Sequence, residues 1–161
     1  MQGDREIIRL LNAVLTNELT SVNQYFLHAR MLQNWGFRAL GKVIYDESIG
    51  EMRHADRLIE RVLFLDALPN LQDLHKLSIG ETVAEMLTAD LALEIAGRAV
   101  QVETIARCEE ARDYVSREIL TGILKDTEEH IDYLETELGL MRQIGEANYL
   151  QSAMGEIEGG D

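Results

Sequence analysis

A glutamate and a histidine three residues apart are the clearest chemical feature of this sequence. Glu51 and His54 occur in Glu51-Met52-Arg53-His54, in the middle of a stretch with strong helical periodicity. At this spacing both side chains leave the same face of a helix. Carboxylate oxygen and imidazole nitrogen are both metal ligands. The pair therefore predicts a metal site on one face of a helix.

Three further residues extend this site. Glu18 and Glu94 are single carboxylates among apolar residues in other helical stretches, and His130 lies in a fourth. In helical bundles that bind two iron ions, two helices each supply Glu-x-x-His and two each supply one Glu. Residues 127–130 read Thr-Glu-Glu-His, so the second pair has Thr127 in place of Glu. The predicted ligand set is Glu18, Glu51, His54, Glu94 and His130.

The composition predicts an all-α protein. One proline, three Phe and one Trp accompany abundant Leu, Ile, Ala and Glu, which favours helices over sheets. The 161 residues fit a single domain, residues 1–161. The formal net charge of −14 disfavours nucleic acid or an anionic membrane as a partner and favours cations.

Two features bear on the compartment. Cys108 is the single cysteine, so no intrachain disulfide can form and a reducing cytosol is expected. Residues 1–5 lack the apolar core of a signal peptide, and no run approaches the ~18 apolar residues of a membrane span. We therefore expect a cytoplasmic protein without a membrane partner.

Hydrophobic periodicity predicts four long helices and one short helix. The expected ranges are about 4–34, 38–65, 81–109, 113–144 and, for the short C-terminal helix, 146–154. The four long helices would form a bundle over about 4–144, with Asp4 as an N-cap and residues 155–161 as a flexible tail. Each candidate ligand falls on the apolar stripe of its helix, so all five should face the core.

The connection lengths predict how the helices are joined. Only tight turns fit around Gly36 and Arg112, so the first two helices should be antiparallel, and likewise the last two long ones. Residues 66–80 can extend to about 50 Å, whereas a helix of about 28 residues is ~42 Å long. This connection can therefore return along the whole bundle. One long crossover between the second and third helices is the ferritin-like arrangement.

Segments along nearly the whole chain resemble bacterioferritin. They include Asn-Gln-Tyr-Phe-Leu-His-Ala-Arg at 23–30, Glu-Met-Arg-His-Ala-Asp at 51–56, Leu-Pro-Asn-Leu-Gln at 68–72 and His-Ile-Asp-Tyr-Leu-Glu-Thr at 130–136. The resemblance implies a hollow shell of twenty-four subunits that stores ferric mineral. It also implies a ferroxidase di-iron centre in each subunit, haem b between pairs of subunits, and a ferredoxin-type reductant. The shell could be a homo-oligomer or could mix this chain with a second bacterioferritin subunit.

The resemblance also assigns roles to the candidate ligands. One iron would be held by Glu18 and His54 and the other by Glu94 and His130. Glu51 would bridge the two irons. The family has a second bridging glutamate at position 127, and its Tyr at position 25 lies beside the di-iron centre.

Thr127 weakens the expectation of ferroxidase activity because its hydroxyl is a neutral and poor iron ligand. Glu128 could replace the missing carboxylate only if the helix were distorted. In a regular helix it is rotated ~100° from position 127 and should point away from the site. A π-bulge would turn Glu128 inward, so the sequence leaves this alternative open.

Met52 has a separate role in the prediction. It lies ~100° around the helix from Glu51, on a second apolar stripe that would face outward. The stripe consists of Tyr45, Ile49, Met52, Ile59 and Leu63, interrupted by Asp56. On composition alone this face would be an ordinary subunit interface. The resemblance to bacterioferritin favours Met52 as a haem axial ligand, paired with the same Met of a twofold-related subunit.

Two classes of function remain open at this stage. The first is a ferroxidase subunit that oxidises Fe(II) and stores Fe(III). The second is a haem-binding, catalytically impaired subunit that assembles with a ferroxidase-active subunit. A rubrerythrin-like peroxidase is disfavoured because paired Cys motifs are missing. His28 and His75 are expected at the surface or at an interface, and Cys108 is expected to be structural.

Overall fold

The computed structural model describes residues 1–156. Residues 157–161, which belong to the expected flexible tail, lie outside the described part. Within that part the regular secondary structure is entirely helical. The helices are α1 (Arg5–Asn34), α2 (Arg38–Phe64), α3 (Val83–Glu110), α4 (Tyr114–Ile144) and α5 (Glu146–Met154). The predicted all-α fold is confirmed, and each helix boundary lies within two residues of its expected position.

Short polar side chains cap the N-termini of α1, α3 and α4. The carboxylate of Asp4 accepts hydrogen bonds from the backbone N–H groups of Glu6 and Ile7, as expected for an N-cap. Thr82 caps α3 and Asp113 caps α4 in the same way. These three caps pair backbone donors that the first helical turn leaves unbonded.

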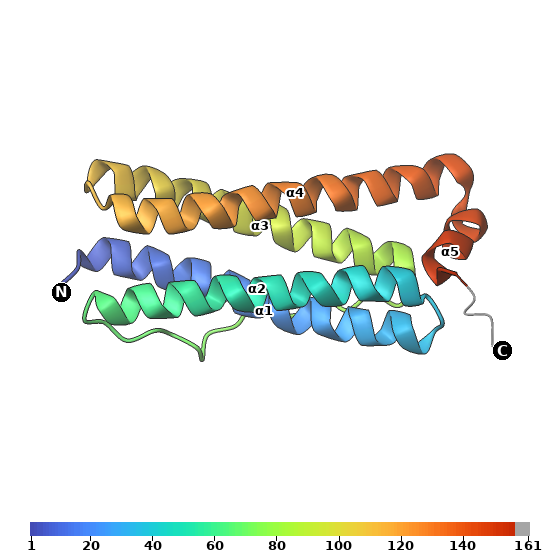
Figure 1. Ribbon diagram of the computed structural model, residues 1–161, viewed down its shortest axis with the longest axis horizontal. Coiled ribbons are helices and arrows are strands. Elements are labelled where there is room, and N and C mark those ends of the chain that lie inside the picture. The colour runs from blue at the N-terminus through green and yellow to red at the C-terminus, as the bar shows by residue number, and fades with distance from the viewer. Residues whose placement is uncertain (157–161) are drawn as a thin grey trace.

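The turn after α1 depends on one glycine. Gly36 has φ of +92°, a conformation that strains any residue with a Cβ atom. It lets the N–H of Phe37 reach back to the carbonyl of Leu32 at 2.9 Å, which closes the end of α1. The chain then reverses into α2, and the two helices run antiparallel (Figure 1).

The four long helices lie side by side along the length of the molecule, and α5 lies across one end of the bundle (Figure 1). Residues 65–82 connect α2 to α3 as a long segment without helices that runs back along the bundle. The predicted ferritin-like topology, with two antiparallel hairpins and one long crossover, is therefore confirmed.

The apolar core consists of two clusters that lie on either side of a polar layer. One cluster includes Leu11, Leu58 and Ile123, and the other includes Leu32 and Met86. Between them in every long helix stand the polar residues that the sequence placed on the inner stripe. The two clusters hold the helices together at both ends of that layer, so the polar side chains are fixed in position by their apolar neighbours.

Side chains of α1 hold the crossover in place along its length. Thr20 accepts a hydrogen bond from the backbone N–H of His75 at 3.0 Å, and Gln24 accepts one from Ser78 at 3.0 Å. Asn12 bonds the N–H of Asn70 in the same manner at 2.8 Å. These contacts satisfy backbone groups that no regular structure pairs.

His28 ends this row and corrects a prediction, because it is fully buried rather than at the surface. Its Nδ1 lies 2.8 Å from Asp90 of α3, and its Nε2 accepts the N–H of Gly80 at 3.1 Å. The acidic partner comes from another helix, so spacing within α1 could not reveal it. Gly80 packs so closely that a Cβ atom there would lie 2.3 Å from the nitrogen of Met86.

Candidate metal centre

The first half of the candidate centre consists of Glu18 from α1 and Glu51 and His54 from α2. Nδ1 of His54 lies 3.1 Å from Oε2 of Glu18 and 3.4 Å from Oε2 of Glu51. All three residues are buried, and one ligand atom from each lies within 4.8 Å of the others. The spacing of Glu51 and His54 on one helix face therefore does what the sequence predicted, and α1 supplies the third ligand.

The second half is built around His130 of α4. Its Nδ1 lies 2.8 Å from Oε1 of Glu94 of α3 and 3.7 Å from Oε2 of Glu47 of α2. Glu47, Glu51 and His130 form a second group whose ligand atoms lie within 4.8 Å. The structure thus brings all five predicted ligands into one layer and adds Glu47. The spacing of Glu47 four residues before Glu51 was the signal that could have identified it.

The electrostatics of this layer favour a bound cation. Burial raises the pKa of Glu51 well above its usual range, and the negative charges of Glu18 and Glu94 raise it further. Burial alone would lower the pKa of His54, but hydrogen bonds to Glu18 and Asp126 and the charges of these two residues together outweigh it and raise the pKa. Burial alone would likewise lower the pKa of His130, but the hydrogen bond to Glu94 and the charges of Glu94, Glu47 and Asp90 together outweigh it and raise the pKa. The layer therefore takes up protons, which a divalent cation would replace.

Tyr25 closes one side of the centre. Its hydroxyl donates a hydrogen bond to Oε1 of Glu94 at 2.5 Å, and its ring meets the ring of His130 edge-on at 5.4 Å between centroids. Burial and the negative charge of Glu94 raise the pKa of Tyr25 well above 10, so the phenol stays protonated. The expectation that this residue lies beside the candidate ligands is met.

Thr127 is buried in the layer, as predicted, and brings no carboxylate to it. α4 is regularly helical through this region, so the π-bulge considered from the sequence does not form. Glu128 instead pairs with Arg98 at 2.8 Å on the exposed side of the bundle. The partner of Thr127 is Gln101 of α3, whose Nε2 donates to its hydroxyl at 3.1 Å. Sequence reasoning missed Gln101, although it lies seven residues after Glu94 and thus on the same helix face.

Asp126 is a second residue that the sequence analysis missed. Its Oδ2 lies 2.8 Å from Nε2 of His54, the ring nitrogen that does not face Glu18. A carboxylate at this position fixes the imidazole so that Nδ1 is directed at a metal. Asp126 also lines a pocket of about 320 Å³ that reaches both histidines from the surface. The centre is therefore accessible through a mouth in which Glu47 and Glu129 add further negative charge.

Comparison with known proteins identifies the architecture. A ferritin-like domain model matches residues 8–144. A bacterioferritin from Mycobacterium leprae is 49% identical over 149 residues, covering 92% of this chain and 94% of that protein. The chain belongs to the bacterioferritin family. A bacterioferritin from Brucella melitensis is 46% identical and covers 94% of both chains. A protein named bacterial ferritin from Pseudomonas aeruginosa is 47% identical over 94% of this chain and 99% of that protein.

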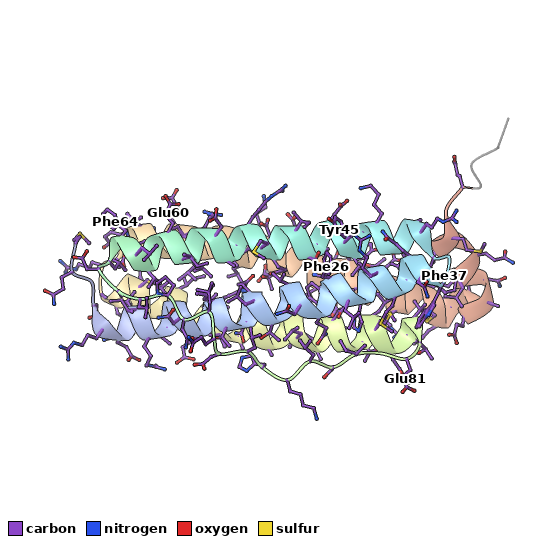
Figure 2. The ribbon with its side chains drawn as sticks, turned by 90° about the horizontal axis from the view of Figure 1, so that it is seen from below. Phe26, Phe37, Tyr45, Glu60, Phe64 and Glu81 are labelled. Carbon is purple, nitrogen blue, oxygen red and sulfur yellow. The ribbon has the colours of Figure 1, made fainter. Side chains whose placement is uncertain are left out.

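The outer face of α2 exposes apolar side chains in this bacterioferritin chain. Met52 is 48% exposed and Leu63 is 55% exposed on this face, as the second apolar stripe predicted. Phe26 of α1 and Tyr45 of α2 lie near one another where the two helices run side by side (Figure 2). The guanidinium of Arg30 lies over both rings, 5.4 Å and 5.2 Å from their centroids. The α1–α2 hairpin of this bacterioferritin chain thus presents apolar and aromatic groups outward.

Two further expectations concern groups outside the centre. Cys108 is buried in the apolar core, and burial raises the pKa of its thiol to about 11, which fits a structural role. None of the helices within residues 1–156 has the length and apolar character that crossing a membrane requires.

Proposed function

We propose that this chain is an iron-storage subunit that takes Fe(II) into the buried layer of carboxylates and histidines, oxidises it there, and passes Fe(III) to a stored mineral. The observation that carries the proposal is the convergence of five predicted ligands from four helices. Both histidines direct Nδ1 at carboxylate oxygens, at 3.1 Å for His54 and 2.8 Å for His130. The bacterioferritin relatives support iron as the metal.

The donor set fits a pair of iron ions. Hard carboxylate oxygens stabilise Fe(III), and imidazole nitrogen accepts both oxidation states. Two Fe(II) ions each give one electron to a dioxygen molecule, which becomes hydrogen peroxide on taking two protons. Glu51 stands between the two histidine-centred groups and belongs to both of them. Its carboxylate must release its proton before it can hold a cation from either side.

The second candidate function is a catalytically impaired subunit that assembles with a ferroxidase-active one. The position of Thr127 favours it, because a neutral hydroxyl faces the layer where the family places a carboxylate. Two divalent ions would then carry four positive charges, against the three carboxylates of Glu18, Glu51 and Glu94. Glu47, 3.7 Å from Nδ1 of His130, would be the fourth carboxylate, but its side chain is 37% exposed.

We also propose that the subunits form a closed shell of twenty-four and that haem b lies between two of them. Met52 fits an axial thioether ligand, since its side chain is exposed in the middle of the outward apolar face. A haem bound there would supply one-electron transfer to the stored iron, with a ferredoxin-type protein as reductant. A cytosolic location accords with the single buried cysteine.

The experiment compares Fe(II) oxidation and mineral loading in the homo-oligomer of the native chain with Glu51→Gln and His54→Ala variants. Oxidation at two irons per subunit that is lost in both variants supports the first function. Oxidation that is absent in the native shell, but returns when a bacterioferritin subunit with an intact centre is mixed in, supports the second. Uptake that is equal in native and variant shells would overturn the assignment of this layer as the iron site.

A further inference from the structure

Gln101 lies at the edge of the metal centre where Thr127 replaces a carboxylate. Its Nε2 donates hydrogen bonds to Oε1 of Glu18 and to Oγ1 of Thr127, each at 3.1 Å. The side chain is only 1% exposed. A carboxylate oxygen accepts hydrogen bonds from the N–H groups of an amide, so the amide nitrogen faces Glu18. This fixes the orientation of the amide.

The amide separates the roles of the two oxygens of Glu18. Oε1 is bonded to Gln101, whereas Oε2 faces Nδ1 of His54 at 3.1 Å. A carboxylate held in this way offers one oxygen to a cation, on the side of His54. Among the described residues no hydrogen bond joins Gln101 to His54, so Gln101 acts on the centre through Glu18.

The two halves of the centre are supported unequally. Around His54, both ring nitrogens are engaged, because Asp126 accepts at Nε2 while Glu18 lies at Nδ1. Around His130, Tyr25 holds Glu94 by a hydrogen bond, but Nε2 of the ring is buried and has no hydrogen-bond partner among the residues that the structure describes. Its additional carboxylate, Glu47, has a side chain that is 37% exposed. Fixed ligands bind metals more tightly than free ones.

We propose that Gln101 is a positioning residue that holds Glu18 as a one-oxygen ligand beside His54, and that it thereby makes the His54 half the tighter of two unequal cation sites. With Thr127 in place of a charged bridge, the two halves lack a second shared ligand. The centre therefore fills in sequence, the His54 half first and the His130 half second.

Packing alone does not explain an amide at position 101. Oε1 of Gln101 is buried without a hydrogen-bond partner in the described residues, which is costly for a polar atom. A residue such as Met would fill the same space without that cost. It would, however, leave Oε1 of Glu18 and the hydroxyl of Thr127 without their donor. The amide of Gln101 is therefore explained by the hydrogen bonds that it donates to Glu18 and Thr127.

The inference rests on the proposed function, so the test must separate the two. Crystals of the assembled protein are soaked in limiting Co(II), and anomalous scattering gives the occupancy at each half. In the native chain the His54 half should be filled first. In Gln101→Met this preference should disappear, and the affinity of the tighter class in a solution titration should fall roughly 10- to 100-fold, as for other residues that support metal ligands.

Two more variants complete the design. Thr127→Val removes one of the two acceptors of the amide and should reduce the preference less than Gln101→Met does. If Gln101→Met does not assemble, the filling order in Thr127→Val tests whether the hydrogen bonds of Gln101 cause the preference for the His54 half. Thr104→Val is the matched control, because among residues 1–156 this buried hydroxyl on α3 bonds only the carbonyl of Val100. It should leave both affinities unchanged.

The outcomes differ for the two claims. Equal filling of both halves in the native chain, or an unchanged preference in Gln101→Met and Thr127→Val, would overturn the role of Gln101 while leaving the metal centre intact. Co(II) that avoids both halves, with titrations unaffected by His54→Ala, would overturn the proposed function itself.

Discussion

Nε2 of His54 lies 2.8 Å from Oδ2 of Asp126, although the two residues come from different helices and Asp126 is largely exposed. Because Asp126 occupies Nε2, Nδ1 is the ring nitrogen that faces the carboxylates of Glu18 and Glu51. We expect Asp126→Ala to weaken Co(II) binding at the His54 half roughly tenfold, because the ring loses the carboxylate that orients it. The pKa of His54 should also fall, since Asp126 contributes to raising it. Co(II) titration and NMR titration of the imidazole measure the two effects.

The control for this variant is Glu129→Ala. Glu129 is an exposed carboxylate that lines the same pocket, and its nearest basic partner is Lys125 at 3.9 Å. It removes the same charge from the mouth of the centre without touching His54. Equal losses of affinity in the two variants would mean that Asp126 acts through charge alone and not through the orientation of the ring.

Thr127→Glu should increase the rate of Fe(II) oxidation by completing Glu-x-x-His on α4. Without metal it buries another charge beside Glu18 and Glu51, so it should lower the free energy of unfolding by roughly 2 to 4 kcal/mol. Added Fe(II) should recover part of this loss by binding to the folded state. Stopped-flow oxidation at two irons per subunit and denaturant unfolding provide the measurements.

The matched control is Thr121→Glu, which adds the same charge to an exposed position of α4. It should change neither rate nor stability appreciably. If the native shell already oxidises Fe(II) rapidly and Thr127→Glu gives no increase, the remaining ligands suffice, and the catalytically impaired alternative fails.

Without added cations, the stability of this protein should fall as pH rises above 4.5, the ordinary pKa of Glu51. Burial and neighbouring charges raise the pKa of Glu51 above 4.5, and carboxylate neighbours raise those of His54 and His130 above 6.5. Between the ordinary and the raised pKa of each group, the folded state binds more protons than the unfolded state, so rising pH favours unfolding. The histidine contribution is complete below 6.5 and is lost as pH passes the raised values.

Hydrogen exchange of core amides across pH measures this dependence. Glu51→Gln should reduce the loss of stability just above pH 4.5, because the variant has no carboxylate at position 51 to bind a proton. A bound cation displaces the same protons, so the affinity for Co(II) should rise with pH. Stability that increases steadily as pH rises above 4.5, in metal-free buffer, is the result that would contradict the prediction.

Met52→Leu should abolish haem binding while leaving the shell assembled, because Leu keeps the apolar face but lacks the thioether sulfur. Met154→Leu is the control, since Met154 is exposed to a similar extent, at 49%, but lies at the end of α5. Haem absorbance per subunit and size-exclusion chromatography measure the two properties. Haem at the native stoichiometry in Met52→Leu would rule out this ligand.

His28→Phe should loosen the crossover. The variant leaves the carboxylate of Asp90 and the N–H of Gly80 without their imidazole partner, so a loss of about 2 to 4 kcal/mol is expected. Hydrogen exchange should accelerate first at residues 75–80. His75→Gln is the control, because His75 is exposed and Gln keeps an N–H donor for Oδ1 of Asn17, which lies 2.7 Å from Nε2 of His75. Unchanged exchange at residues 75–80 would show that other contacts hold the segment.

The sequence predicted the fold because helical periodicity, caps and connection lengths are local features. It also predicted that the five candidate ligands face one buried layer, since each lies on an apolar stripe at a spacing that its own helix determines. Gln101 and Asp126 were missed for a common reason. Each acts on a residue of a different helix, 83 residues away for Gln101 and Glu18 and 72 for Asp126 and His54. Spacing within one helix cannot show which side chains meet across the bundle.

The error at His28 has the same physical origin. An isolated histidine on α1 is expected at the surface when no acidic residue stands at helical spacing. Its partner, Asp90, belongs to α3, and the second partner is a backbone N–H of the crossover. Thr127 shows the opposite case. Its inward direction followed from periodicity alone, and only its hydrogen-bond partner needed the structure.

The contacts between α1 and the crossover fix the position of the crossover along the length of α1. Thr20, Gln24 and His28 stand four residues apart, so successive acceptors rise ~6 Å along the helix, and each receives one backbone amide of residues 75–80. The segment has no secondary structure of its own, but its backbone is hydrogen-bonded at intervals to a regular helix. These bonds end at Gly80, shortly before α3 begins. The same helix that carries Glu18 therefore also sets how far along the bundle Glu94 stands.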